Sequence, residues 1–304
     1  MYDIAIIGGG TAGLTAGIYG ARAGKKVVIY EGESFGGQII NTPEIENYPG
    51  IKNISGYEFS ENLYKQTTAL GAEFVFDGVS GVKKHPDGSF ELQVEFGDNV
   101  TSKTVILACG AKHRELGLAA EQKYLGRGIS YCATCDGSFF KGKDVSVAGG
   151  GNTALEEAIY LSGLCNKVYL IHRRDEFRAE SALVKKAEAI PNIEFVLSAE
   201  VKELLGDDKL NGINVFMKKD ESVRKLDVEA LFVAIGQVPS NKPFADLVEL
   251  DEAGYVVAGE DCKTSCEGVF AAGDGRTKTL RQLSTAAADG AVAAVNACDY
   301  LLSK

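Results

Sequence analysis

The sequence contains no long apolar run, no excess of positive charge and no tryptophan among its 304 residues. No apolar stretch approaches the roughly 20 residues that a membrane-spanning helix needs. The 32 basic residues are outnumbered by 42 acidic ones, and a net charge of −10 argues against a nucleic-acid or anionic-membrane surface. The N-terminus enters a strand pattern at once, without the basic region and cleavage site of a signal peptide. We therefore expect a cytoplasmic protein that binds neither membrane nor nucleic acid.

The length and the composition are those of a soluble globular protein with more than one domain. At roughly 100–200 residues per domain, 304 residues predict two domains and are enough for a substantial core. The apolar fraction of 45% and the charged fraction of 24% are ordinary for this class of protein.

The cysteines are scattered along the chain, and their number is odd. This is not the pattern of a secreted disulfide framework. Two close pairs stand out, and in a reducing compartment a close pair is usually a metal site, a redox couple or chance. The pairs are Cys132 with Cys135 and Cys262 with Cys266, and the remaining cysteines are Cys109, Cys165 and Cys298.

A glycine-rich turn follows the first apolar segment. Residues 3–7 predict a short strand, and Gly8, Gly10 and Gly13 form a G-x-G-x-x-G pattern before a helix and a second strand that ends at Glu31. The first glycine permits the tight turn, the second lets a pyrophosphate approach, and the third lets helix and strand pack closely. The phosphates would lie at the helix N-terminus, and Glu31 would bind a ribose 2′-OH. A glycine turn without a ligand is the alternative.

The same pattern recurs in the second half of the chain. Residues 144–148 predict a strand, followed by a G-x-G-x-x-A turn, a helix and a strand over 167–171. Arginines stand where the acidic residue is missing, and a guanidinium forms bidentate bonds to phosphate oxygens. The first site therefore suits FAD or NAD, and the second suits NADPH, a merely solvated arginine face being the alternative. The second pattern comprises Gly149, Gly151, Asn152, Thr153, Ala154, His172, Arg173, Arg174 and Arg178.

The remainder of each half also repeats. Residues 89–96 and 211–218 alternate like half-exposed strands, and each is followed by a strand that ends in a small turn. These repeats predict an α/β fold with two Rossmann-like dinucleotide-binding domains of three layers (ββα), the second inserted into the first. We expect the FAD-binding domain to comprise residues 1–112 and 246–304, and the NADPH-binding domain to comprise residues 113–245.

Cys132 and Cys135 lie between the two nucleotide patterns. Two cysteines at this spacing, often at a helix start, can close a small disulfide ring, and the helix dipole can lower a thiol pKa. Asp136 follows directly and would be placed to exchange a proton with a departing thiolate. Two alternatives stay open: a structural zinc site with Cys262 and Cys266, and a pair of buried inert cysteines with Asp136 as a helix cap. A flavin site and a nicotinamide site on either side of the pair make electron flow the better explanation.

The sequence resembles the low-molecular-weight, bacterial-type thioredoxin reductases over essentially the whole chain. The most specific motifs are Cys-Ala-Thr-Cys-Asp at 132–136 and His-Arg-Arg-x-x-Phe-Arg-Ala at 172–179. The resemblance also rests on the two glycine turns, on Gly36-Gly37-Gln38, on residues 44–50, on Gly273-Asp274 and on Arg281-Gln282. Cys109 in place of a common threonine and Glu267 in place of a common proline are departures that do not touch the redox chemistry.

The resemblance implies roles for individual residues. Cys135 would be the sulfur next to the flavin, Cys132 would attack the partner disulfide, and Asp136 would donate the proton. Three arginines would hold the NADPH 2′-phosphate, and no metal is expected. FAD contacts are implied for Gly8, Gly10, Gly13, Glu31, Gly37, Gln38, Asn47, Asp274, Arg281 and Gln282, and NADPH contacts for Gly149, Gly151, Asn152, Thr153, Ala154, His172, Arg173, Arg174 and Arg178.

The resemblance thus implies an NADPH-dependent flavoprotein, a thioredoxin-disulfide reductase that works as a homodimer. Electrons would pass from NADPH to FAD, to the Cys132–Cys135 disulfide, and then to thioredoxin or a thioredoxin-like protein, with the NADPH domain rotating between the half-reactions. One rival is a flavin-dependent reductase that serves a peroxidase or receives electrons from ferredoxin. The other is a non-enzymatic protein that binds zinc and a nucleotide.

Overall fold

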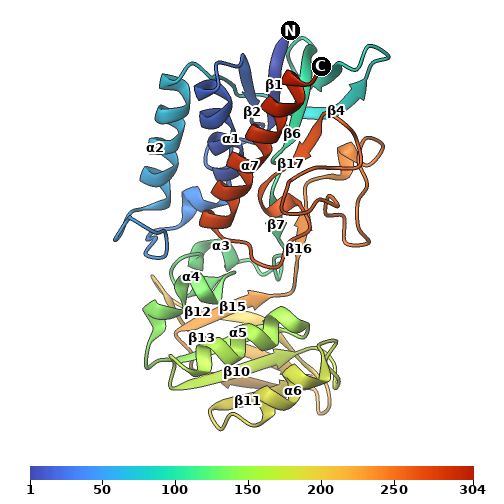
Figure 1. Ribbon diagram of the computed structural model, residues 1–304. Coiled ribbons are helices and arrows are strands. Elements are labelled where there is room, and N and C mark those ends of the chain that lie inside the picture. The colour runs from blue at the N-terminus through green and yellow to red at the C-terminus, as the bar shows by residue number, and fades with distance from the viewer. The chain divides into compact units, whose positions relative to one another are not determined.

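The computed structural model describes residues 1–304, and of Asn41 only the backbone. The chain divides into two compact units (Figure 1). Unit 1 comprises Met1–Lys112 and Val238–Lys304, and unit 2 comprises His113–Gln237. The chain leaves unit 1 in β7 (Ala111–His113) and returns in β16 (Gln237–Pro239), whereas the sequence suggested a return after residue 245. Among the described residues, no helix combines the length and the apolar character that a membrane crossing requires.

Unit 1 is built on a seven-stranded sheet in the order β3-β2-β1-β6-β5-β4, with β17 also paired to β6. The pairs among β1, β2, β3, β6 and β17 are parallel, and β4 and β5 extend the sheet in antiparallel fashion. The strands are β1 (Tyr2–Ile7), β2 (Val27–Tyr30), β3 (Glu73–Val75), β4 (Val79–Lys84), β5 (Phe90–Val94), β6 (Val100–Leu107) and β17 (Val269–Ala271).

Three helices of unit 1, α1, α2 and α7, run side by side (Figure 1). A Cβ added to Gly290 of α7 would lie 2.2 Å from the Ala12 oxygen of α1, so the close approach of these helices requires glycine at that position. The helices are α1 (Thr11–Arg22), α2 (Gly56–Ala69) and α7 (Leu283–Leu302), with short 3₁₀ turns η1 (Gly37–Asn41), η3 (Lys242–Phe244) and η4 (Gly273–Gly275).

Alternate side chains of the central strand β1 pack on opposite faces of the sheet in unit 1, and both faces are covered. Ile4 and Ile6 of β1 belong to one hydrophobic cluster, which includes residues of α1 and α7. Ala5 and Ile7 belong to another cluster, on the face that packs against β5 and the segment around Phe244. A parallel strand buried on both faces reads as a continuous apolar run, as residues 4–7 do.

Unit 2 repeats this plan. A five-stranded parallel sheet has the order β11-β10-β9-β15-β8, and a three-stranded antiparallel sheet has the order β12-β13-β14. The parallel strands are β8 (Ile129–Ser130), β9 (Asp144–Gly149), β10 (Lys167–His172), β11 (Ile193–Leu197) and β15 (Ala230–Ala234). The antiparallel strands are β12 (Ala199–Gly206), β13 (Leu210–Met217) and β14 (Ser222–Leu226). The helices are α3 (Glu121–Tyr124), α4 (Ala133–Asp136), the 3₁₀ turn η2 (Gly137–Phe140), α5 (Asn152–Ser162) and α6 (Ser181–Glu188).

The predicted α/β fold with two Rossmann-like units is confirmed. In each unit a strand, a glycine turn and a helix lead to a parallel neighbouring strand, β1–α1–β2 in unit 1 and β9–α5–β10 in unit 2. The two alternating segments, residues 89–96 and 211–218, largely form β5 and β13, and both strands are antiparallel to their neighbours. Each glycine turn therefore lies at the carboxyl end of a buried parallel strand, where α/β folds bind their ligands.

Candidate active site

The glycine turn of unit 1 has two glycines that packing requires and one that leaves space. A Cβ at Gly13 would lie 1.9 Å from the Gly8 oxygen, and one at Gly8 would lie 2.3 Å from the Ala108 oxygen. Among the described residues, the nearest atoms to a Cβ at Gly10 would be the Gly36 oxygen at 3.9 Å and the Gly37 Cα at 4.0 Å. The room above Gly10 fits the close approach of a pyrophosphate to the N-terminus of α1.

Glu31 stands at the end of β2 and is tied to this turn. Its Oε2 accepts a hydrogen bond from the Gly9 N–H at 2.7 Å, and its Oε1 accepts one from the Glu33 N–H at 2.9 Å. These two bonds fix the carboxylate beside the turn. Each oxygen keeps acceptor capacity, so the group can also receive a ribose hydroxyl.

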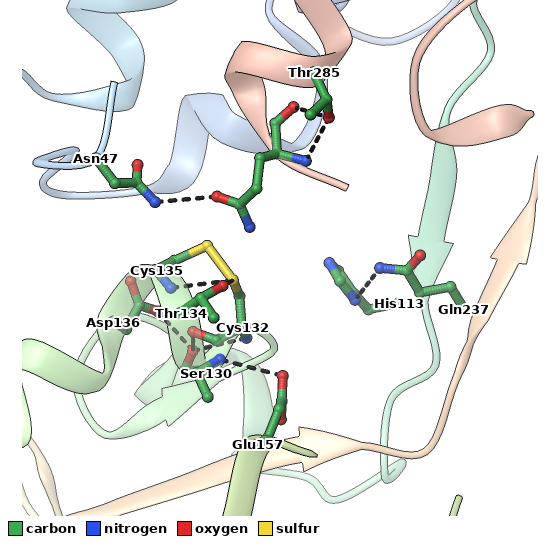
Figure 2. Close-up of a disulfide and its surroundings, with 12 residues drawn as sticks. Asn47, His113, Ser130, Cys132, Thr134, Cys135, Asp136, Glu157, Gln237 and Thr285 are labelled. Carbon is green, nitrogen blue, oxygen red and sulfur yellow. Dashed lines mark hydrogen bonds between the residues drawn. A yellow bond between two sulfur atoms is a disulfide. The ribbon is translucent and has the colours of Figure 1, made fainter. Parts of the chain in front are cut away.

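Two further pairs of predicted flavin residues meet within unit 1. The Asn47 amide donates to Gln282 Oε1 at 3.0 Å, and Gln282 precedes α7 with its N–H bonded to Thr285 Oγ1 at 3.1 Å (Figure 2). Arg281 Nε donates to the Asp274 carbonyl at 3.3 Å. Gln38 donates through Nε2 to the Ala111 carbonyl, a bond not suggested by the sequence.

Asp274 has a buried carboxylate oxygen, Oδ1, without a hydrogen-bond donor among the described residues. Burial raises the pKa of this carboxyl, although the positive charges of Lys278 and Arg281 oppose the rise. A buried acceptor without a donor costs free energy, so Asp274 fits a ligand that brings a hydroxyl or an N–H to this point.

The glycine turn of unit 2 also combines a glycine that packing requires with one that leaves space. A Cβ at Gly149 would lie 2.4 Å from the Ala234 oxygen and 2.6 Å from the Ala154 Cβ, whereas one at Gly151 would meet no heavy atom of the described residues within 4 Å. Asn152, the first residue of α5, donates to Glu180 Oε1 and accepts from the Glu180 N–H, both at 2.9 Å. The open side of this turn therefore lies at Gly151, and Thr153 beside it is exposed.

The segment after β10 separates one buried histidine from three exposed arginines. His172 is buried beneath the turn, where a Cβ at Gly150 would lie 2.1 Å from its ring, and its Nε2 bonds with the Glu176 carbonyl at 3.1 Å. Burial lowers the pKa of His172, which favours the neutral ring. The Arg178 N–H donates to the Gly150 carbonyl at 2.8 Å, which fixes the arginine segment beside the turn.

The guanidinium groups of Arg173, Arg174 and Arg178 form no ion pair with any described residue, and all three side chains are exposed. Cationic groups without an internal partner, fixed beside an open glycine turn, are suited to bind a phosphate.

The predicted disulfide is present in unit 2. Cys132 and Cys135 are bonded through their Sγ atoms, and their Cα atoms are 5.3 Å apart (Figure 2). Cys132 immediately precedes the single turn of α4, and its Sγ accepts from the Cys135 N–H at 3.2 Å. The pair is therefore a closed redox couple on a helix turn, held through its own backbone.

Residues 2–290 match the family model described as pyridine nucleotide-disulphide oxidoreductase. The chain belongs to this family. Its curated relatives include the thioredoxin reductase of Mycoplasma pneumoniae, 42% identical over 99% of this chain and 96% of that protein. The thioredoxin reductase of Mycoplasma genitalium is 41% identical over 98% of this chain and 95% of that one. Among solved structures, thioredoxin reductase from Streptococcus pyogenes MGAS5005 is similar with a TM-score of 0.95, at 39% identity, over 100% of this chain and 99% of that one.

Asp136 is a carboxyl group close to the disulfide, and a carboxyl group at this place can donate or accept a proton during thiol chemistry. Asp136 Oδ2 accepts from the Ser130 hydroxyl at 2.6 Å, and that hydroxyl oxygen accepts from the Cys132 N–H at 3.1 Å. Burial raises the pKa of Asp136, and the Ser130 hydrogen bond partly opposes the rise. Asp136 is thus connected to the redox pair through one hydroxyl group (Figure 2).

The other five cysteines are free thiols. Burial raises the pKa of Cys109 to about 12 and the pKa of Cys262 to about 11, which disfavours the reactive thiolate. The described residues contain no group of three or more histidine, cysteine, aspartate or glutamate side chains that could hold a metal ion. Because Cys132 and Cys135 are bonded to each other, the zinc alternative has no ligand set in the described chain.

One buried cluster was not predicted. Asp289 of α7 accepts from Arg276, from Lys278 Nζ at 2.8 Å and from the Gly273 N–H at 2.9 Å. This carboxylate thereby fixes the turn that carries Asp274. The available signal was an aspartate in the middle of an alanine-rich stretch of the helix, since a buried charge needs a partner.

Proposed function

We propose that the protein is a thioredoxin reductase that transfers electrons from NADPH through FAD to the Cys132–Cys135 disulfide and on to oxidised thioredoxin. The observation that carries the proposal is the closed redox pair in a chain with two nucleotide turns of different chemistry. The first turn has an acid at the end of its second strand, and the second has unpaired arginines. The names of relatives at 41–42% identity over nearly the full length support it.

The residues of unit 1 fit a bound FAD. The turn with Gly8, Gly10 and Gly13 would bind the pyrophosphate, and Glu31 the ribose. The buried Oδ1 of Asp274 would accept from a hydroxyl of the ribityl chain, which supplies the donor that this atom lacks. We expect the remaining contacts at Gly37, Gln38, Asn47, Arg281 and Gln282. When bound, the flavin takes up a hydride equivalent and releases two electrons to a disulfide.

The residues of unit 2 fit a bound NADPH. The turn with Gly149, Gly151 and Ala154 would bind the pyrophosphate where a Cβ at Gly151 meets no heavy atom of the described chain within 4 Å. The three unpaired arginines would hold the 2′-phosphate, a group that NADH lacks. We expect Asn152 and Thr153 to contribute at the start of α5 and His172 to support the turn from below.

The two sulfurs of the redox pair would act one after the other. In the reduced enzyme, the Cys132 thiolate would attack the partner disulfide, forming a mixed disulfide and releasing one partner thiolate. The Cys135 thiolate would then attack Cys132 Sγ, which re-forms the internal disulfide and releases the second partner thiolate. Asp136 would give a proton to a departing thiolate and recover it from water.

One pair must serve both a flavin and a protein substrate, so we propose that unit 2 rotates about its two connections between the half-reactions. A reversible cross-link between the units should abolish thioredoxin turnover until it is cleaved. Unchanged turnover in the locked protein would exclude the rotation. By its resemblance, the protein is also inferred to be a cytoplasmic homodimer, which light scattering and cell fractionation would check.

The decisive experiment is an anaerobic titration with NADPH and, separately, NADH, followed by a thioredoxin-linked disulfide assay. We expect a yellow protein whose flavin absorbance is bleached by NADPH, and NADPH-dependent reduction of thioredoxin. Cys135→Ser should lose thioredoxin reduction and keep the bleaching, whereas the matched Cys266→Ser should keep both. Bleaching without any disulfide reduction in the wild type would refute the proposed function.

A further inference from the structure

Glu157 is a second carboxyl group at the redox turn, and the chemistry above does not use it. It lies on α5, which packs against α4, and its side chain reaches the turn that carries the disulfide (Figure 2). Its Oε1 accepts a hydrogen bond from the Ala133 N–H, between the two cysteines, at 3.2 Å. Its Oε2 is buried and has no hydrogen-bond partner among the described residues.

No positive charge compensates this carboxyl group. None of the described lysines, arginines or histidines forms an ion pair with Glu157. On α5 itself the neighbouring charge is Glu156, which has the same sign. From α4 the titratable groups are Asp136 and the two cysteines.

The other elements packed against α5 also bring charged and titratable groups, several of which have partners of their own. Lys167 of β10 pairs with Glu194 of β11 at 2.6 Å, Asp144 of β9 accepts from Asn166, and His172 is neutral. Helix α6 brings Lys185 and Lys186, which form no ion pair with Glu157, and Glu188, which has the same sign as Glu157. Burial, with a smaller contribution from Glu156, raises the pKa of Glu157 to about 7.

We propose that Glu157 is a positioning residue of the redox pair, which fixes the Ala133 backbone with one oxygen and takes up a proton at the other when the disulfide is reduced. This inference rests on the proposed function. Reduction places a thiolate on the turn whose Ala133 N–H bonds this carboxyl group, and a like charge nearby favours the protonated acid. The two groups then titrate as a coupled pair.

The step balances as follows. Two electrons, supplied by the reduced flavin of the proposed function, break the Sγ–Sγ bond. One proton goes to a cysteine sulfur, the other sulfur remains a thiolate, and a second proton from solvent goes to Glu157 Oε2. When the pair passes its electrons to the partner disulfide and closes again, both protons are released.

The test measures how the redox equilibrium of the pair depends on pH. The flavin-loaded protein is equilibrated with mixtures of reduced and oxidised dithiothreitol between about pH 6 and pH 9, the range of ordinary thiol titration. Thiols are then alkylated, and the fraction of reduced Cys132 and Cys135 is counted by mass spectrometry. No NADPH or thioredoxin is needed, so the result stands apart from the proposed function, which would fail in the thioredoxin assay of the wild type.

Glu157→Gln keeps an acceptor for the Ala133 N–H but cannot take up the proton. Above the oxidised-state pKa of about 7, we expect its midpoint potential to fall less steeply with pH, by up to one proton per two electrons. The matched control is Glu188→Gln, the same substitution at an exposed position of the neighbouring helix α6, which should keep the wild-type slope. Equal slopes for wild type and Glu157→Gln, or the same flattening in Glu188→Gln, would overturn the proposal.

Infrared difference spectroscopy gives a second readout, which does not depend on the variant folding. Reduction of the wild type should produce the carbonyl band of a newly protonated carboxyl group, with the usual shift in D2O. If Glu157→Gln folds, the band should be absent. Reduction of the wild type without any gain of protonated carboxyl would contradict the proposal.

Discussion

Arg276 and Asp289 form a bidentate ion pair in the interior of unit 1. Arg276 Nε lies 2.9 Å from Asp289 Oδ2, and Arg276 Nη2 lies 2.8 Å from Oδ1. Only 2% of the Arg276 side chain and 7% of the Asp289 side chain are exposed. The same carboxylate bonds Lys278 and the Gly273 N–H, so it couples the packing of α7 to the turn that carries Asp274.

We expect Asp289→Asn to destabilise unit 1, because it leaves Arg276 and Lys278 buried with too little negative charge. Breaking a buried pair by removing one partner costs about 3–5 kcal/mol. Urea unfolding followed by circular dichroism measures the loss, and absorbance after gel filtration measures retained flavin, which should also fall. Asp299→Asn, an exposed position on the same helix, is the control and should change neither quantity.

The same substitution makes a prediction about acid stability. Burial opposes ionisation of Asp289, but hydrogen bonds from Arg276 and Lys278 outweigh it and keep the pKa of this carboxyl below its usual range. Its contribution is therefore complete above the unfolded pKa of about 3.9 and is lost as pH falls through the lowered folded value. The free-energy gap between wild type and Asp289→Asn should narrow at low pH, and a constant gap would contradict this assignment.

We expect alkylation to divide the cysteines into three groups. In the oxidised native protein, iodoacetamide should modify Cys266 and leave Cys109, Cys165, Cys262 and Cys298 unmodified, because burial raises the pKa of these four thiols. Cys132 and Cys135 should react only after reduction. Peptide mass spectrometry reads the sites, with urea-unfolded protein as the positive control. Rapid labelling of Cys262 in the native state would be inconsistent with its buried position.

We expect the double variant Arg173→Ala, Arg174→Ala to lose its preference for NADPH. A charge-assisted hydrogen bond contributes about 1.5–3 kcal/mol, so the KM for NADPH should rise by roughly 10- to 100-fold, with little change for NADH. Flavin reduction in a stopped-flow instrument measures both. Arg224→Ala, whose exposed arginine pairs with Glu194, is the control. An equal loss for NADPH and NADH would point to a general defect of unit 2.

We expect Ser130→Ala to move the high-pH limb of thioredoxin reduction to higher pH. The Ser130 hydrogen bond lowers the pKa of Asp136 against the dominant effect of burial, so its removal raises that pKa further and keeps the acid protonated to higher pH. The profile of kcat/KM against pH measures the shift. Ser138→Ala, at an exposed position nearby, should leave the profile unchanged. A shift to lower pH would show that Asp136 is not the acid.

Local patterns made the fold predictable. The two glycine turns, the apolar strands before them and the Cys132–Cys135 spacing each lie within a few residues, and their chemistry depends on backbone conformation that the local sequence dictates. The Asn47–Gln282, Arg276–Asp289 and Glu157–Ala133 contacts could not be predicted in this way, because their partners come from different elements.

His172 shows what the sequence could not predict about a single side chain. In the sequence it begins an arginine-rich segment, and the resemblance predicts that it contacts the nicotinamide nucleotide. In the fold its ring lies beneath Gly150 and bonds with the Glu176 carbonyl. Sequence spacing cannot distinguish these environments, since the side chains of successive strand residues point to opposite faces and the burial of each face depends on the packed helices.

By itself, the sequence determined the α/β class, the duplicated nucleotide turns, the redox pair and the sign of the charge beside each turn. The tertiary structure decided which polar groups are buried, which have partners and which, such as Asp274 Oδ1 and Glu157 Oε2, have none among the described residues. The reason is physical: a turn is a property of neighbouring residues, whereas desolvation and hydrogen-bond satisfaction depend on every element that packs around a side chain.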